Sequence, residues 1–482
     1  MALPHAVKTY LDASRLPYRL VPHPRTETLE QTAQSTQISP RRLVRVVVLR
    51  DAQGLVTAIL PTSHILDFSQ LCTVTERELD PLYGEDYAAI FHDCEPGSHP
   101  PLPEVFGLRV ALMDNSLAVP GEIFFEAGSH DVLVAMASEH FQQLLGGQIL
   151  QAGFAHPVDA LGHLSDHSDD PTQGIVSATS RYLPIHLKGG VEPVRDLPAL
   201  PETVRLILDW QANPKDDVEE ELAQIIDADA LLARLILHWA RSPYYGQRQP
   251  VDSVRDAIRQ VLGFDLVMHL ALGISIGRTC RIPPDGPLGL RAHWRHAVYC
   301  TALVGRLIQF VPQNLRPRPG LAQLGALLHN FGLLLLGHLF PAQFFLLNRF
   351  VAVNAHLPVD LVERYVLGAE HPHIGGWLIQ AWQLPREVIA ALRWHHREDY
   401  SLPYTEYSNL VLIANRLLRR HRIGDEGTTE LPTAVMSSLG LTAEQAMTAL
   451  AELMARRTYL DELAWQLAME VPQEQPTVAT AY

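Results

Sequence analysis

The sequence predicts a multidomain protein, in which an N-terminal α+β domain with a mainly antiparallel sheet precedes an all-α domain. Three observations predict this fold class. The chain has 482 residues, too many for one ordinary hydrophobic core. Short β-branched runs separated by turn residues fill the first 150 residues. From Leu197 onward, apolar residues instead recur at the three- and four-residue spacing of helices.

The N-terminal region carries a clear hairpin signal. Asp51–Gly54 separates two β-branched runs and is typical of a tight turn. We predict strands at Val44–Arg50, Leu55–Leu60, Leu108–Met113 and Val132–Ala137, with flanking helices over residues 3–15 and 138–146. These elements define a first domain over residues 1–150.

The remaining chain divides into a linker, a helical domain and two C-terminal parts. Residues 151–195 are polar and rich in turn residues, which is typical of an interdomain linker. We predict a helical domain over residues 196–420, a helical extension over 421–470 and a frayed tail over 471–482. Helical periodicity is found at Val218–Ile226, Ala230–Ala240, Val254–Leu262, Ala292–Phe310, Leu321–His338, Val359–Val366, Ile374–Trp382, Arg386–Trp394, Ser408–Arg420 and within 441–468.

Composition narrows the functional classes. A formal net charge of −15 disfavours a broad nucleic-acid-binding face, so we expect no DNA partner. Four widely spaced cysteines and an N-terminus without a signal-peptide pattern indicate a cytoplasmic protein. The most apolar stretch, Leu321–Phe340, is interrupted by polar residues. It predicts a buried helix pair rather than a membrane span.

An ordered set of residues in the helical region resembles the HDOD domain, a signalling relative of the HD-type metal-dependent phosphohydrolases. The resemblance spans roughly residues 190–420. It rests on Leu197–Pro201, Trp294–His296, Gly325–Gly332, Glu363, Gly368, His371, Ile374–Gly375, Trp382–Pro385 and the pair His395–His396. It implies an all-helical fold and a role in signal transduction.

The same resemblance implies a degenerate metal site. In the HD pattern, two histidines and two aspartates hold divalent cations that activate water. Here His296 and His329 keep the histidine positions, whereas Asn330 and Asn415 replace both aspartates. With every remaining ligand neutral, Mg²⁺ or Mn²⁺ would bind poorly, so we expect no cofactor and interpret the histidines as buried, hydrogen-bonded groups.

A transition metal is the alternative to that interpretation. Imidazole suits Zn²⁺ or Fe²⁺, for which the candidate ligands are His296, His329, His371, His395 and His396. His371, His395 and His396 resemble extra ligand positions of HD-GYP phosphodiesterases. The GYP signature is absent after His396, which disfavours hydrolysis of cyclic dinucleotides.

The first domain resembles the YbaK/prolyl-tRNA synthetase-associated domain, which deacylates mischarged aminoacyl-tRNA. The resemblance rests on Asp51–Leu60, Asp67–Phe68, Pro96–Pro101, Met113–Leu117 and Glu126–Asp131. It implies ligand-binding candidates at Gly97, Pro100, Asp114 and Gly128. The family's lysine corresponds to Arg45, the candidate catalytic position. Arginine there is bulkier and does not lose its proton. Together with Arg41 and Arg42 it forms a small basic cluster, which we interpret as a solvated turn.

Three functions follow from these observations. The first, which we favour, is a non-catalytic bacterial signalling protein: the degenerate HD domain is a binding or scaffold module, and the N-terminal domain is a sensor or docking module. Its partners would be proteins. The second is an aminoacyl-tRNA deacylase regulated by the HDOD domain, for which tRNA would be the partner. The third is a metal-dependent phosphohydrolase.

Overall fold

The computed structural model describes residues 3–82, 85–108, 110–146, 150–160, 197–212, 217–246 and 250–470. The chain separates into two compact units. Among the described residues, unit 1 comprises the chain up to residue 160 together with Arg349–Val366, and unit 2 comprises the rest. The predicted linker lies outside the described residues from position 161 onward, and so does the predicted tail from position 471.

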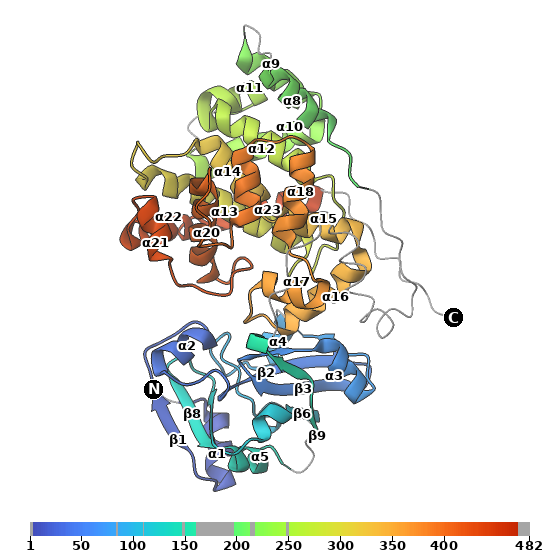
Figure 1. Cartoon of the computed structure of the whole chain (residues 1–482), viewed down its shortest axis with the longest axis vertical. Helices are drawn as coiled ribbons and strands as arrows, with labels where there is room; N and C mark the ends of the chain where they lie inside the picture. Colours follow the sequence, from blue (N-terminus) through green and yellow to red (C-terminus); the bar gives the residue numbers. More distant parts are fainter. Residues whose placement is uncertain are drawn as a thin grey trace, which may run out of the picture. The chain divides into compact units, whose positions relative to one another are not determined.

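Unit 1 contains a mixed sheet in the order β1-β8-β7-β2-β3-β6-β9, with β5 paired to β2 (Figure 1). Its strands are β1 Arg19–Pro22, β2 Leu43–Asp51, β3 Gly54–Pro61, β5 Asp80–Pro81, β6 Val110–Asp114, β7 Glu122–Glu126, β8 Val132–Ala137 and β9 Leu150–Ala152. The predicted hairpin is confirmed, because β2 and β3 pair antiparallel from Asp51 opposite Gly54 to Val44 opposite Pro61. Three pairs are parallel: β2 with β7, β3 with β6 and β6 with β9.

Short helices and a second small sheet complete unit 1. The helices are α1 His5–Ser14, α2 Leu29–Thr36, α3 Phe68–Thr75, α4 Glu85–Ile90 and α5 Ser138–Leu144, with 3₁₀ turns η1 Pro103–Phe106, η2 Asn115–Ala118 and η3 Val158–Ala160. β4 (His64–Leu66) pairs antiparallel with β10 (Ala155–Pro157). A buried core of mainly aliphatic side chains joins α1 and α5 to the sheet, and includes Val7, Val48, Phe125 and Phe141. The α+β class is confirmed.

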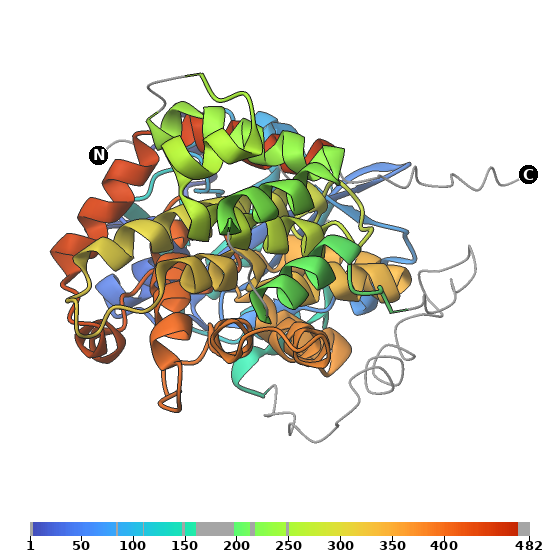
Figure 2. The same cartoon turned by 90° about the horizontal axis from the view of Figure 1, so that it is seen from above.

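Unit 2 is helical throughout its described part (Figure 2). Its helices are α8 Glu202–Ala212, α9 Val218–Asp227, α10 Ala230–Arg241, α11 Val254–Asp256, α12 Phe264–Gly277, α13 Leu290–Phe310, α14 Pro319–Leu328, α15 Phe331–Leu339, α18 His371–Ala381, α19 Arg386–Trp394, α20 Thr405–Arg419, α21 Thr433–Ser438, α22 Ala443–Met454 and α23 Arg457–Glu470. A 3₁₀ turn (η4, Pro243–Tyr245) and a π-helical turn (η5, Ala257–Leu262) also belong to it. α13 packs against α14, α20, α22 and α23.

The division between the units falls within two helices. α16 (Pro341–Val353) begins in unit 2 and ends in unit 1, and α17 (Val359–Leu367) lies in unit 1 up to Val366. The segment Arg349–Val366 is therefore remote in sequence from the rest of unit 1.

The apolar stretch near residue 330 is two buried helices, as predicted. α14 and α15 meet at His329–Asn330. Over the described residues, Pro319–Leu339 alone is long and apolar enough to cross a membrane, and 94% of its most apolar window is buried inside the protein. Burial to that degree is typical of a core helix pair.

Candidate functional site

The functional candidates of unit 2 converge on one buried cluster of histidines. α13 supplies His296, the α14–α15 junction supplies His329, α18 begins with His371, and His395 and His396 follow α19. The ring centroids of His296 and His329 lie 4.6 Å apart, and those of His329 and His395 lie 5.1 Å apart. His371 lies 5.4 Å from His395 and 5.3 Å from His396. The fold thus brings together all five histidines singled out from the sequence.

A close helix–helix approach holds His371 in this cluster. α15 and α18 meet at Gly332 and Gly375, and a Cβ on Gly332 would lie 1.9 Å from the carbonyl oxygen of His371. No side chain fits at that distance. The glycine of the His-Asn-Phe-Gly segment therefore allows α18 to start directly against the histidine at position 329.

The ring nitrogens of His329 and His395 have defined roles. Nδ1 of His329 donates to the carbonyl oxygen of Ala326 over 2.7 Å, and Nδ1 of His395 donates to that of Leu392 over 2.8 Å. Because a carbonyl only accepts, each Nδ1 carries the proton and each Nε2 presents a lone pair. Nε2 of His329 is buried without a hydrogen-bond partner among the described residues. This arrangement is typical of histidines that ligate a metal.

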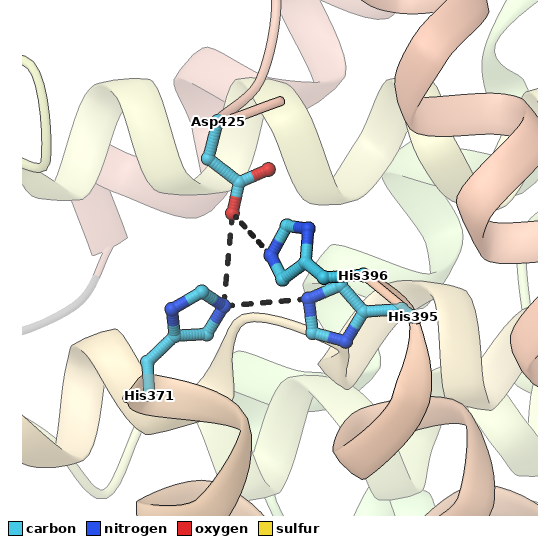
Figure 3. Close-up of side chains that lie close together, drawn as sticks. All are labelled: His371, His395, His396 and Asp425. Atoms are coloured by element: carbon cyan, nitrogen blue, oxygen red, sulfur yellow. Dashed lines mark hydrogen bonds and ion pairs between the residues drawn. The ribbon is translucent and has the colours of Figure 1, made fainter. Parts of the chain in front are cut away.

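Asp425 is the functional residue that the sequence analysis missed. It follows α20 on the Gly424–Gly427 loop, and its side chain is buried among the histidines (Figure 3). Its Oδ2 lies 3.7 Å from Nε2 of His371 and 3.6 Å from Nε2 of His396. Its Oδ1 is buried without a hydrogen-bond partner. The expectation that every remaining ligand is neutral is therefore wrong, because a carboxylate enters from outside the HD pattern.

The local sequence explains how this loop reaches the cluster. Gly424 has φ +98°, and a Cβ there would lie 2.6 Å from Nε2 of His296. Only glycine lets the backbone pass this close to the imidazole and place Asp425 inside. The Gly-Asp-Glu-Gly pattern indicates a turn, but turns are normally solvated, so the sequence carried no signal that this aspartate is buried.

His396 lies between two carboxylates. Its Nδ1 donates to Oε1 of Glu426 over 2.8 Å, and its Nε2 faces Asp425. Burial opposes the charged imidazolium, but Glu426 and Asp425 outweigh burial and hold the pKa of His396 well above its usual range. Burial likewise opposes the charged form of Asp425, yet His396 and the other histidines hold the pKa of this carboxyl well below its usual range. Each partner therefore favours the charged form of the other, so His396 is protonated and Asp425 is ionised although both are buried.

Both asparagines form hydrogen bonds with His296. Nδ2 of Asn330 donates to Nδ1 of His296 over 3.2 Å and to Oδ2 of Asp425 over 2.8 Å. Nε2 of His296 donates to Oδ1 of Asn415 over 3.0 Å. Both ring nitrogens of His296 are thus engaged by amides. This agrees with the interpretation of His296 as a hydrogen-bonded core group.

The remaining donors fit a transition metal. His371, His395, His396 and Asp425 each offer one ligand atom, and these atoms all lie within 4.8 Å of one another. A second grouping contains His296, His329 and Asp425. The first suits a tetrahedral cation better, because the Nδ1 protons of His395 and His396 are each held by an oxygen acceptor. Nε2 of His395 then lies 3.3 Å from Nε2 of His371, and Nε2 of His396 faces Asp425 (Figure 3).

The candidates of unit 1 do not form one comparable cluster. The carboxylate of Asp114 accepts hydrogen bonds from the backbone of Ser116, Phe154 and Ala155, which makes it a loop cap. The loops of Gly97 and Gly128 are adjacent, since Ser98 donates to the carbonyl oxygen of Ser129 over 3.2 Å. Pro100 is buried nearby in sequence. These ligand-binding assignments stay predictions.

Arg45 differs from the expected solvated turn. Arg41 is exposed and Arg42 is half-buried, but Arg45 lies on β2 with 7% of its surface exposed. Position along the chain explains the difference, because Arg41 and Arg42 precede β2, whereas Arg45 lies within it and β2 is buried on both faces from Leu43 to Leu49. Its guanidinium contacts residues of the Arg349–Val366 segment.

Comparison with known proteins identifies both domains. The HDOD domain family model matches residues 197–398, and the aminoacyl-tRNA editing domain model matches residues 23–144. A Marinobacter aquaeolei VT8 structure, named as a candidate signal transduction protein, is 28% identical with a TM-score of 0.80 and covers 97% of this chain and 100% of its own.

Two other similar proteins cover less of the chain. An HDOD domain protein of unknown function from Geobacter sulfurreducens is 21% identical with a TM-score of 0.46, over 61% of this chain and 99% of its own. An uncharacterized Treponema pallidum protein is 25% identical over 53% of this chain. The chain spans about half of that relative's length (48%). The chain thus carries an HDOD domain at residues 197–398, preceded by an aminoacyl-tRNA editing domain at residues 23–144.

Proposed function

We propose that the chain is a non-hydrolytic regulatory protein of signal transduction, in which the HDOD domain is a binding module and the editing domain a docking module. The HDOD match and the similarity to the Marinobacter protein support a regulatory role. One observation supports the proposal that the HDOD domain does not hydrolyse phosphoesters. Asn330 and Asn415 occupy the two carboxylate positions of the HD pattern and engage both ring nitrogens of His296.

Burial of the cluster supports binding rather than turnover. His371 and His395 have no exposed surface, and Asp425 is 5% exposed. A phosphoester substrate has to reach a metal-activated water, and that needs an open coordination position beside solvent. Side chains enclosed on all sides are typical of a structural or sensing site.

The ligand that this cluster fits is a divalent transition metal such as Zn²⁺ or Fe²⁺. His371, His395, His396 and Asp425 would hold it, and Glu426 would orient His396. When bound, the ion supplies bonds that link the start of α18, the end of α19 and the Asp425 loop. In its absence His396 is protonated beside Asp425 and Glu426, and Nε2 would have to lose its proton to bind an ion, so metal uptake should release a proton.

Metal analysis of the purified full-length chain tests this proposal. We expect about one equivalent of metal per chain in the wild type after incubation with Zn²⁺ or Fe²⁺ and desalting. Asp425→Asn should lose at least about nine-tenths of it, because it removes the one anionic ligand atom from the set. Asp285→Asn is the matched control, since Asp285 is exposed and pairs with Arg291.

Phosphodiester and phosphomonoester hydrolysis is measured on the same samples. No variant should exceed the background of the chelator-treated chain. Metal-dependent turnover that Asp425→Asn abolishes would refute the non-hydrolytic role. A wild type that takes up no more metal than Asp425→Asn would refute the metal ligand and leave the regulatory role to be tested with protein partners.

Aminoacyl-tRNA deacylation is the second candidate, favoured by the editing-domain match at residues 23–144. It is tested by incubating the full chain with mischarged tRNAs. Turnover that Arg45→Met abolishes would support deacylation. The burial of Arg45 argues against it, since a catalytic cation has to reach the substrate.

A further inference from the structure

Arg45 is a buried cation whose two Nη atoms donate to neutral oxygens, while its Nε is buried without a hydrogen-bond partner among the described residues. Its Nη1 donates to the carbonyl oxygen of Val353 over 2.8 Å, and its Nη2 donates to Oδ1 of Asn354 over 2.9 Å. A longer contact of 3.5 Å runs from Nη2 to the carbonyl oxygen of His64. Burial lowers the pKa of Arg45 to about 9, so the guanidinium is charged at neutral pH. A charge buried without a carboxylate requires several well-placed dipoles to be tolerated.

Asn354 supplies the central dipole and is completely buried. Its Oδ1 accepts from Arg45 and from the backbone N–H of Leu66, the latter over 2.7 Å. Its Nδ2 donates to the carbonyl oxygens of Leu66 and Phe350, each over 3.0 Å. One amide therefore pairs with both backbone groups of Leu66 on β4, as a neighbouring strand would, and also binds Arg45.

Further contacts extend the docking along the whole Arg349–Val366 segment. Nε2 of His356 lies 3.0 Å from the carbonyl oxygen of Thr62, and the hydroxyl of Tyr365 donates to Oδ2 of Asp67 over 2.7 Å. The rings of Phe350 and Phe68 meet edge to face with centroids 6.2 Å apart. Arg349 pairs with Asp80. Polar anchors thus flank an aromatic contact, which is the composition of a specific interface.

We propose that the part of the editing domain around Arg45, formed with β4, is a socket for residues 349–366 of the same chain, and that Arg45 is a docking residue. This segment lies inside the HDOD sequence match, yet its contacts place it in unit 1. The inference deepens the docking role proposed above by naming the occupant of the editing domain.

The geometry explains why arginine stands where the editing family has lysine. The guanidinium fork reaches Val353 and Asn354 at once, with a separate nitrogen for each. A lysine ammonium carries its three donors on one nitrogen with a shorter reach, so it lacks the two separated nitrogens with which the fork meets these two oxygens. The substitution therefore favours a fixed peptide occupant over the substrate that the lysine serves.

Hydrogen exchange of the full-length chain, followed by mass spectrometry, tests the socket. Asn354→Ala should raise the exchange rate of the Leu66 amide at least about tenfold, because its acceptor is removed. Arg45→Met should raise exchange in peptides spanning residues 350–357, more than 300 positions away. Arg45→Lys should give an intermediate rate, because it keeps the charge and one donor. Ala355→Ser is the control, as an exposed neighbour of Asn354.

Peptides from α13 serve as the internal reference in every variant. Reciprocal effects confined to residues 62–68 and 350–357, with α13 unchanged, support the socket. Exchange at both segments that is unchanged by Asn354→Ala and Arg45→Met would overturn it. So would wild-type deacylation of mischarged tRNA that depends on Arg45, because an occupied socket admits no tRNA end. Metal content is unaffected by any of these variants, so failure here leaves the metal proposal standing.

Discussion

The Arg45 socket of unit 1 and the histidine cluster of unit 2 are both buried and polar, but they differ in how many of their polar atoms are paired. In the socket, a single cation and a single amide find their main acceptors and donors within the chain itself. In the cluster, Nε2 of His329, Nε2 of His396 and Oδ1 of Asp425 have no hydrogen-bond partner among the described residues. Buried polar atoms are normally paired.

This difference separates an occupied site from one that is ready for a ligand. In the socket, both Nη atoms of Arg45 and both polar atoms of the Asn354 side chain are paired, and Nε of Arg45 is the guanidinium nitrogen left without a hydrogen-bond partner among the described residues. The cluster presents lone pairs and one carboxylate at a common centre, where a cation would pair them. On the two proposals above, the domain similar to tRNA-editing enzymes would hold a segment of its own chain, whereas the histidine cluster would bind a cation.

The largest expected effect comes from the helix contact beneath the cluster. Gly332→Ala should destabilise unit 2 by more than about 3 kcal/mol, because the added methyl overlaps the backbone of His371. Chemical denaturation followed by circular dichroism measures it. Gly153→Ala is the control, since the nearest atom to its Cβ is 3.6 Å away. Equal stability of the two variants would mean that α15 and α18 are not held this closely.

Loss of the Asn354 amide should cost almost as much in unit 1. Asn354→Ala leaves Arg45 and both backbone groups of Leu66 without this partner, and we expect a loss of about 3 kcal/mol in the free energy of unfolding. Ala355→Ser should change it by less than about 0.5 kcal/mol. Denaturant titration with a probe in unit 1 provides the measurement, and a neutral Asn354→Ala would make the socket a minor contact.

Metal should stabilise the cluster and leave the socket unchanged. At a free Zn²⁺ concentration of about 100 times its Kd, the free energy of unfolding of unit 2 should rise by about 2.7 kcal/mol. Chelation should reverse the gain, and Asp425→Asn should abolish it while Asp285→Asn keeps it. Differential scanning calorimetry reads both units. A gain in stability confined to unit 1 would mean that the metal binds there and not at the histidine cluster.

The smallest expected effect concerns pH. Burial lowers the pKa of His293 to about 3, whereas an unfolded histidine titrates near 6.5. A base with a depressed pKa contributes stability above its unfolded pKa and loses it as the pH falls. Between pH 8 and pH 5 this group should cost unit 2 about 2 kcal/mol. In His293→Leu, the free energy of unfolding of unit 2 should fall by about 2 kcal/mol less between pH 8 and pH 5 than in the wild type. Unfolding titrations at the two pH values measure it, and equal losses in both proteins would contradict a neutral buried His293.

Much of the fold was predictable from local pattern. The β2–β3 hairpin and the helices α9, α10, α13 and α20 appear within a few residues of their predicted bounds. The side chains of Asp229 and Ser253 cap the N-termini of α10 and α11, and aspartate and serine are residue types favoured at that position. α12 and α16 were missed, because helices buried on nearly every face lack the amphipathic period that marks the others.

The sequence by itself determined the order of the domains, the five histidines and the replacement of two aspartates by Asn330 and Asn415. Those features reside in residue types at fixed spacings within one chain segment. Only the tertiary structure decided that Asp425 joins the cluster and that Asn354 fills the Arg45 socket. Asp425 meets Asn330 across 95 positions and Asn354 meets Arg45 across 309. Contacts over such separations depend on how the helices and the sheet pack, which no local periodicity records.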